Sequence, residues 1–435
     1  MCHSPCPPRL DPTEHNVGQA GTQLWNGVVI TSARCRQPKP CHPRGGDTRR
    51  GRRPALCHAD NSILVSALTP QSGFAQRIVE WQQRSGRHDL PWQSTRDPYH
   101  IWLSEIMLQQ TQASTVIPYY LSFLQTFPNL NVLADAKQDD VMHAWAGLGY
   151  YARARNLQRC AQIIMRDHAG HFPQTAAALS QLPGIGPSTA AAIAAFAFDE
   201  RQPILDGNVK RVLARYFGVQ GDPSKRGIEQ ALWRHAHTVL DAAPAELNMS
   251  AYTQGQMDLG AQVCTRHKPN CTQCPLNTDC YARQHACQHT LPTPPVRRPV
   301  PERHCLMLIL ECQAHLLLYR QPSPGIWGGL WGLPQFDTLD TLIAACVQMG
   351  VADRATAIST PPLLPLAGVT HGFTHFRLHI EPWWLRSQAR KLPPPPADGT
   401  WIPIHELTNT GMPAPLKKLL NTLYAAPTET AHDDC

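Results

Sequence analysis

Residues 182–190 read Leu182-Pro183-Gly184-Ile185-Gly186-Pro187-Ser188-Thr189-Ala190 and separate two stretches with helical periodicity. Two glycines one residue apart let the backbone turn tightly and expose its N–H groups. We expect the next helix to begin near Ser188 and to point its positive end at the turn. The pattern predicts a site for an anion such as a backbone phosphate. A plain connection between two helices has the same pattern, so the hairpin alone does not decide between the two.

Helical periodicity continues on both sides of this hairpin, from Phe74 to Cys280, with short Gly- and Pro-containing breaks. The pattern predicts helices over Ile101–Gln112, Val141–Trp145, Tyr151–Asp167, Thr189–Phe198 and Val209–Tyr216. We therefore expect an all-α domain over residues 71–287.

The composition and the hydrophobic periodicity of the chain change after residue 287. Residues 288–303 contain five prolines, which predicts a stiff linker. Strand-like runs follow at Cys305–Glu311, His315–Tyr319 and Phe373–Pro382, and a helical pattern covers Leu339–Met349. The sequence thus predicts a small α+β domain over residues 304–425 and a tail over residues 426–435.

Residues 1–70 hold nine Lys/Arg against four Asp/Glu, which is most of the net charge of +7. A disordered basic arm, an organelle transit peptide and translated upstream sequence all remain open. We favour a disordered or artefactual leader, because its prolines interrupt the amphipathic pattern of a transit peptide. The remaining chain is weakly basic, so we expect modest nonspecific affinity for nucleic acid.

No secretion signal begins the chain, and the longest near-apolar run, Ala190–Phe198, is half of a bilayer span. We therefore expect no membrane association and a reducing, cytoplasmic compartment, in which cysteines bind metals more often than they form disulfides.

Four of the fifteen cysteines lie within seventeen residues: Cys264, Cys271, Cys274 and Cys280, spaced C-x6-C-x2-C-x5-C. Thiolates select zinc or iron–sulfur clusters. Zinc ribbons usually carry two separated C-x2-C pairs, and this chain has one, which favours a [4Fe–4S] cluster. Four unrelated thiols are the remaining alternative. Cys287 lies outside the motif, and the basic run 266–268 could place the loop against phosphates.

Glu105 lies in Ile101-Trp102-Leu103-Ser104-Glu105-Ile106-Met107-Leu108, where its neighbours at helical spacing are largely apolar. A carboxyl group among apolar side chains has a raised pKa and could donate a proton. A glutamate on the solvent face of a helix is the ordinary alternative.

Asp206 lies in Ile204-Leu205-Asp206-Gly207-Asn208-Val209, just before a helical segment. The position predicts a helix cap. Backbone N–H groups there are expected to keep its pKa low and its carboxylate charged. One neutral and one charged carboxyl form the pair that cleaves a glycosidic bond.

Together these motifs resemble the helix-hairpin-helix DNA glycosylases, and within them the A/G-specific adenine glycosylases of the MutY type. The resemblance spans residues 74–425 and rests on Leu90-Pro91-Trp92, Trp102–Gln112, Gly147–Asn156, the hairpin, Leu205–Val212 and the four cysteines. It implies two helical subdomains with the active site between them, and a target base that is flipped out of the duplex. Glu105 matches the family's proton donor to adenine N7, and Asp206 the acid that stabilises the oxocarbenium-like sugar.

The resemblance also implies roles for other residues. Gln110 and Tyr150 match residues that wedge into the duplex, and Trp92 and Leu108 fall where the adenine pocket is expected. DNA-binding positions are Gly184, Gly186, Ser188 and Lys210. The implied partner is double-stranded DNA with adenine opposite 8-oxoguanine or guanine, bound by a monomer.

Related bifunctional glycosylase–lyases carry a lysine at the second residue after the hairpin's last glycine, and this chain has Ser188 there. We therefore expect an enzyme that leaves an abasic site and does not nick the strand, although Lys210 could trap a minor adduct.

The C-terminal domain resembles the nudix fold of 8-oxo-dGTP hydrolases, on Cys305–Tyr319 and Gly325–Pro334. The acidic helix that holds Mg²⁺ in those hydrolases has no counterpart after Pro334, so we expect recognition without hydrolysis. Phe373, Thr374 and His375 match the family's loop that reads 8-oxoguanine. A strand end with buried histidines is the alternative.

Three other functions remain open at this stage. A glycosylase–lyase for oxidised pyrimidines is disfavoured by Ser188 and by the C-terminal domain. An iron–sulfur DNA-binding redox sensor would need neither Glu105 nor Asp206. A Mg²⁺-dependent nucleotide hydrolase is disfavoured because the acidic helix is missing.

Overall fold

The computed structural model describes residues 24–25, 28–29, 73–295, 299–323, 325–351 and 363–424. The contacts divide the chain into one unit over Met1–Val65 and a second over Ser66–Cys435. In the first unit, β1 (Leu24–Trp25) pairs antiparallel with β2 (Val28–Val29). The predicted leader otherwise lies outside the described residues, as does the predicted tail. Among the described helices, none is long and apolar enough to span a bilayer.

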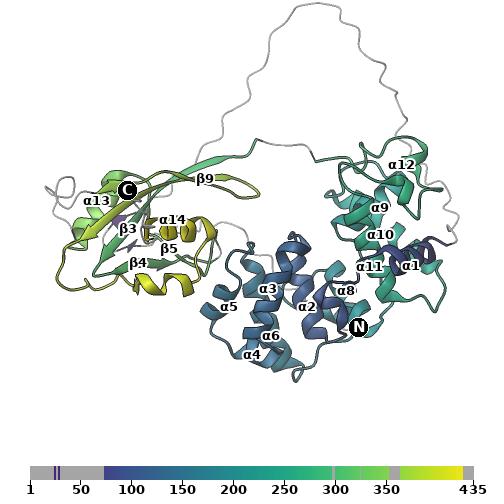
Figure 1. Cartoon of the computed structure of the whole chain (residues 1–435), viewed down its shortest axis with the longest axis horizontal. Coiled ribbons are helices and arrows are strands. Elements are labelled where there is room, and N and C mark those ends of the chain that lie inside the picture. Colours follow the sequence, from purple (N-terminus) through teal and green to yellow (C-terminus); the bar gives the residue numbers. More distant parts are fainter. Residues whose placement is uncertain are drawn as a thin grey trace, which may run out of the picture. The chain divides into compact units, whose positions relative to one another are not determined.

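The first part of the second unit is entirely helical (Figure 1). The α-helices are α1 (Phe74–Ser85), α2 (Pro98–Leu108), α3 (Ala113–Thr126), α4 (Leu130–Asp135), α5 (Gln138–Ala144), α6 (Ala152–Asp167), α7 (Ala176–Leu179), α8 (Pro187–Phe198), α9 (Gly207–Phe217), α10 (Arg226–Asp241), α11 (Met249–Asp258) and α12 (Tyr281–Gln284). The 3₁₀-helices are η1 (Pro91–Ser94) and η3 (Cys271–Gln273), and η2 (Leu259–Val263) is a short π-helix.

Helix α8 belongs to two hydrophobic cores at once. Ala190, Ile193 and Ala194 pack into the core formed mainly by α2–α6. Ala191 and Ala195 pack into the core formed by α1 and α9–α11. A helix that is buried on all sides must be apolar all round. This position explains the near-apolar run that the sequence shows at residues 190–198.

The segment after α2 departs from the predicted helix over Ile101–Gln112. The helix ends at Leu108, and Gln110 has a left-handed φ of 59°. The physical reason is tertiary: the buried guanidinium of Arg153 donates to the backbone carbonyls of Ile106, Met107 and Gln109 at 2.7–2.9 Å. These bonds compete with continuation of the helix.

The second part of this unit is an α+β fold, as predicted (Figure 1). Its strands are β3 (Glu302–Cys312), β4 (His315–Arg320), β5 (Trp331–Gly332), β6 (Gln335–Phe336), β7 (Leu364–Pro365), β8 (Val369–Gly372), β9 (Arg377–Ser387) and β10 (Gly399–Pro403). Its helices are α13 (Leu339–Gln348), η4 (Ile404–Asn409) and α14 (Ala414–Tyr424).

The sheet runs in the order β10-β4-β3-β9-β7, and β3 and β9 pair in parallel along their whole length. β3 begins at Glu302, inside the segment predicted as linker. The predicted strand over Phe373–Pro382 divides into a turn and a strand: Phe373 donates its backbone N–H to the carbonyl of Phe376 at 2.8 Å, and β9 starts at Arg377. Thr374 and His375 therefore form the exposed tip between β8 and β9.

Candidate active site

Helix α2 carries Glu105 into the helical part of the chain. The helix begins at Pro98, and the side chain of Asp97 caps it by accepting the backbone N–H of Tyr99 at 2.8 Å. Glu105 lines a cavity of about 340 Å³. The cavity is formed largely by polar and aromatic side chains from α1, η1, α2, α8, α11 and the segments next to them: Gln82, His88, Trp92, Gln93, Thr95, Arg96, Ile101, Ser104, Glu105, Phe196, Asn248, Ser250, Ala251 and Gln254.

The carboxyl group of Glu105 is held neutral by its surroundings. Burial, and secondly the nearby carboxylate of Asp206, raise the pKa of Glu105 to about 8. Within the described residues no hydrogen bond to this carboxyl offsets the loss of hydration. The raised pKa predicted from its apolar neighbours is therefore confirmed, and Glu105 is a potential proton donor at neutral pH.

Asp206 caps helix α9, as its position in the sequence predicts. Its Oδ1 accepts the backbone N–H of Val209 at 2.7 Å, and its Oδ2 accepts from the Nδ2 of Asn208 at 3.3 Å. The expected low pKa was wrong, because burial raises the pKa of Asp206 despite these hydrogen bonds and the nearby Arg211 guanidinium. The two carboxyl groups interact, which places the predicted pair in one site.

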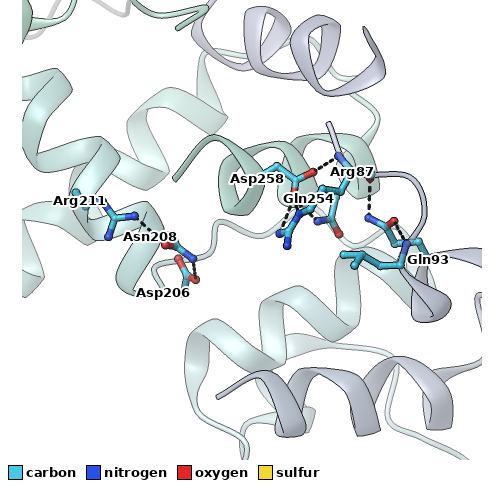
Figure 2. A network of polar contacts seen from close by, with 8 residues as sticks. Arg87, Gln93, Asp206, Asn208, Arg211, Gln254 and Asp258 are labelled. Carbon is cyan, nitrogen blue, oxygen red and sulfur yellow. Dashed lines mark hydrogen bonds and ion pairs between the residues drawn. The ribbon is translucent and has the colours of Figure 1, made fainter. Parts of the chain in front are cut away.

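Hydrogen bonds connect Asp206 through Asn208 to Arg211 (Figure 2), and Arg211 in turn binds the cysteine loop. The Nη2 of Arg211 donates to Asn208 Oδ1 at 2.9 Å and to the carbonyl of Gly260 at 2.7 Å, while its Nε donates to the carbonyl of Cys264 at 2.8 Å. Gly260 permits this packing, because a Cβ there would lie 2.5 Å from Asn208 Cβ. Asn208 thus touches both Asp206 and the arginine that holds the loop.

The four predicted ligand cysteines lie close together, because the thiols of the other three all act on that of Cys274. Burial, with the other three thiols contributing, raises the pKa of Cys274 to about 12. Backbone N–H groups of Leu276 point at the sulfur of Cys274, and those of Ala282 and Arg283 at the sulfur of Cys280. Such donors suit sulfur atoms that carry negative charge.

Arg215 anchors this loop from inside the protein. It is 2% exposed. Its guanidinium donates to the Sγ of Cys264 at 3.3 Å and to the carbonyls of Thr265 and Arg266 at 2.7 and 3.0 Å. Its Nε donates to the carbonyl of Leu291 at 2.8 Å. One buried cation therefore fixes the loop on both sides of the cysteine motif.

The hairpin before α8 has the predicted tight geometry. Gly184 has a φ of 80°, and a Cβ there would lie 2.9 Å from Asn156 Cβ. Gly186 caps α8, which begins at Pro187. The Oγ of Ser188 accepts the backbone N–H of Leu205 at 2.9 Å, so this hydroxyl binds the segment next to Asp206. The Nζ of Lys210 pairs with Glu229 Oε1 at 2.6 Å.

Gln110 and Tyr150 both have the left-handed backbone that L-residues rarely adopt, with φ of 59° and 49°. Arg153 braces both loops: besides the α2 carbonyls, its Nη2 donates to the carbonyls of Leu148 and Gly149 at 3.3 and 3.1 Å. The same guanidinium lies 5.5 Å from the ring of Tyr150. Tyr150 is 47% exposed, so its ring is presented at the surface.

The wall of the cavity opposite α2 is held by a buried carboxylate (Figure 2). Asp258 is fully buried and accepts from the backbone N–H and side chain of Arg87 and from Gln254. The carbonyl of Arg87 accepts from Gln93 at 2.9 Å, which places η1 and therefore Trp92. The other residue predicted for the pocket, Leu108, packs against the larger core and does not line the cavity.

The tip between β8 and β9 rests on a cluster of aromatic side chains and exposes two polar side chains. Phe373 stacks on Phe376 with a centroid distance of 4.5 Å, and Trp327 lies 5.5 Å from Phe373. Thr374 and His375 stay exposed. The hydroxyls of Thr374 and Tyr150 lie 3.3 Å apart, so two residues singled out from the sequence meet here.

Several residues of this site carried no usable signal in the sequence. Arg87, Arg153, Arg211, Arg215 and Asp258 are charged groups whose partners lie far away along the chain. The one indication in the sequence is at Asp258, whose apolar neighbours Met257 and Leu259 are consistent with burial of this carboxylate.

The raised pKa of Glu105 predicts that Glu105→Gln stabilises the protein at neutral pH. The carboxyl ionises near pH 4.5 in the unfolded chain but only near pH 8 in the folded one. Stability is therefore lost as the pH rises between these values, at about 1.4 kcal/mol per pH unit. Thermal melting of wild type and variant between pH 5 and 7.5 should show an advantage of the variant that grows with pH. Exposed Glu246→Gln is the control, and a Glu105→Gln advantage that is absent or shrinks with pH contradicts this account.

Two family models match this chain: the HhH-GPD superfamily of base excision DNA repair proteins over residues 103–237, and the NUDIX domain over residues 305–422. An adenine DNA glycosylase of Buchnera aphidicola is 35% identical over 80% of this chain and 96% of its own length. The human adenine DNA glycosylase is 32% identical over 82% of this chain and 75% of its own. The solved structure of a thermostable thymine-DNA glycosylase is 29% identical and has a TM-score of 0.44. The match covers 49% of this chain and 95% of the chain of that structure. The predicted fold class, a helical glycosylase domain followed by a nudix domain, is confirmed, and the chain belongs to the adenine DNA glycosylases of base excision repair.

Proposed function

We propose that this enzyme hydrolyses the N-glycosidic bond of adenine opposite 8-oxoguanine or guanine in double-stranded DNA and leaves an abasic site. The observation that carries the proposal is the pair of interacting carboxyl groups, Glu105, which lines the cavity between α2 and α11, and Asp206, whose charge acts on it. A neutral and a charged carboxyl in one site are what glycosidic cleavage requires.

Glu105 acts first as the acid in this proposal. Adenine that has been flipped out of the duplex enters the cavity beside Trp92, and the protonated carboxyl of Glu105 donates to N7. Protonation makes the base a better leaving group, because the electrons of the breaking bond flow into a ring that carries positive charge. The Glu105 carboxylate that remains can then accept a proton from the attacking water.

Asp206 supplies the negative charge. Its carboxylate form is stabilised by the backbone N–H of Val209, by Asn208 and by the nearby Arg211, whereas Glu105 has no such partner among the described residues. Asp206 is therefore the carboxyl that ionises while Glu105 holds its proton. Positive charge that develops on the sugar favours this ionised form further.

Contacts to the duplex come from three places in this proposal. The hairpin at Gly184 and Gly186 directs the first N–H groups of α8 at a phosphate. Gln110 and Tyr150, on strained loops braced by Arg153, insert at the mispair. Lys210 contributes through its positive charge only when it leaves Glu229, which makes it the weakest of the assigned DNA contacts.

The tip formed by Phe373, Thr374 and His375 reads the base opposite the adenine. Its hydroxyl and imidazole are exposed on an aromatic platform, which suits hydrogen bonds to the edge of a purine. The domain itself recognises and does not hydrolyse, because α13 carries one acidic residue, Asp340, where an Mg²⁺-binding helix would carry several.

Cys264, Cys271, Cys274 and Cys280 hold a [4Fe–4S] cluster in this proposal. A zinc ion bound tetrahedrally at about 2.3 Å would bring the sulfurs within about 4 Å of one another. Among the described residues these thiols do not form a group whose ligand atoms all lie within 4.8 Å, which favours a larger metal centre. These four cysteines would hold the cluster, which would cross-link the loop that exposes residues 266–268. Arg215 and the backbone N–H groups around the sulfurs fit its negative charge.

The enzyme is expected to release the base without nicking the strand. Ser188 cannot form a Schiff base, and its hydroxyl is engaged by the backbone of Leu205. Lys210 is paired with Glu229, so its amine is not free to attack the sugar.

The test is single-turnover base release from a duplex with adenine opposite 8-oxoguanine, with nicking scored before and after alkali. Wild type should release adenine and nick only after alkali. Glu105→Gln and Asp206→Asn should each slow release by about 10³-fold or more, because each removes one half of the acid–base pair. Exposed Glu246→Gln should match wild type. Release by either carboxyl variant at the wild-type rate, or strong nicking without alkali, would overturn the assignment.

Thr374→Val removes one hydroxyl and keeps the shape of the side chain. The preference for adenine opposite 8-oxoguanine over adenine opposite guanine should fall by about tenfold, the effect of one lost hydrogen bond. Thr374→Ser keeps the hydroxyl and should keep the preference. The same base-release assay on the two duplexes measures both variants, and an unchanged preference in Thr374→Val would remove the tip from the reading of the opposite base.

A further inference from the structure

The start of β3 and the start of β9 bring together three potential metal ligands that have no part in the site described above. Glu302 and His304 lie two residues apart on β3 and therefore share one face of the sheet. In the parallel register His304 stands opposite His379 of β9. Ligand atoms of Glu302, His304 and His379 all lie within 4.8 Å of one another.

The ring of His379 is oriented by its neighbours. Its Nδ1 lies 3.2 Å from the hydroxyl of Thr370, which stands opposite it on β8. Its Nε2 is shielded from solvent, has no hydrogen-bond partner among the described residues, and faces Glu302 Oε2 at 3.4 Å. When the Nδ1 proton is donated to Thr370, the Nε2 lone pair points toward a carboxylate, and a cation bound between the two groups would remove their repulsion.

A proton can bridge two of these groups, but it leaves the second imidazole without a role. The ring of His304 stacks on that of His379 at a centroid distance of 4.6 Å. Two imidazoles and one carboxylate are a donor set that Zn²⁺ accepts with a water in the fourth position. Nitrogen donors disfavour Mg²⁺ and Ca²⁺, which prefer oxygen. Thr370 supplies the outer hydrogen bond that orients metal-binding histidines.

We propose that Glu302, His304 and His379 bind one divalent transition-metal ion of the zinc type. The exposed ring of His304 turns out of the stack when it binds, so that its lone pair meets the ion. The ion would tie the first residues of β3, which follow the proline-rich segment, to β9. All three ligands come from β3 and β9, so we assign the ion a role in holding the starts of these two strands together.

Arg377 supplies a competing cation. Its Nη1 lies 3.0 Å from Glu302 Oε1, and its side chain is 53% exposed. Because this guanidinium neutralises the carboxylate that the ion needs, its removal should strengthen metal binding. A purely structural role of the histidine pair gives no reason for such a gain.

The experiment is equilibrium dialysis of the full chain, with its iron content measured, against Zn²⁺ and separately Mg²⁺, followed by elemental analysis. Wild type should hold one zinc more than Glu302→Gln, His304→Gln and His379→Gln, and no additional Mg²⁺. His405→Gln is the matched control, because the exposed pair His405–Glu406 lacks a second imidazole. Circular dichroism and iron content establish that each variant is folded.

Arg377→Gln should bind the additional zinc at least threefold more tightly than wild type. This gain of function keeps the test valid if a ligand variant fails to fold. Equal zinc contents in wild type and the three ligand variants, loss of zinc in His405→Gln as well, or unchanged affinity in Arg377→Gln would each overturn the proposal.

Discussion

Burial of the Glu105 carboxyl beside Asp206 is the constraint around which the helical part of this enzyme is arranged. A carboxyl group that is removed from water, without a hydrogen bond to replace it, keeps its proton at neutral pH. Glu105 has no hydrogen bond among the described residues, whereas the backbone N–H of Val209, the amide of Asn208 and the nearby Arg211 offset part of the effect of burial at Asp206. In the mechanism proposed above, this difference makes Glu105 the proton donor and Asp206 the carboxylate, which is the division that a glycosidase needs.

Two buried arginines, Arg153 and Arg215, and the partly buried Arg211 hold the loops of the proposed site. Arg153 fixes the two strained turns at Gln110 and Tyr150, Arg211 connects Asn208 with the cysteine loop, and Arg215 anchors that loop on both sides. A planar guanidinium presents five donors in a fixed geometry and can satisfy more carbonyls at once than the three donors of a lysine ammonium. These loops contain few apolar side chains of their own, so their order depends on such long-range hydrogen bonds.

The sequence allowed much of this to be predicted, because the signals involved are local. The periodicity around the hairpin, the cap at Asp206 and the apolar neighbours of Glu105 are all set within a few residues. The prediction of a low pKa for Asp206 was wrong because the burial of this residue comes from elements distant in the chain, which local sequence does not show. The end of α2 at Leu108 and the anchoring of Trp92 through Asp258 depend likewise on partners far away in sequence, and no periodicity reports them.

The pH dependence of single-turnover adenine release tests the central claim most directly. If neutral Glu105 is the acid, the rate constant should fall about tenfold per pH unit once the pH exceeds the pKa of about 8. Below that value Glu105 stays protonated, and release should not fall between pH 6 and 7.5. A rate constant that stays flat up to pH 9.5, or that already declines from pH 5, would contradict the account, because the proton donor would then not be this buried carboxyl.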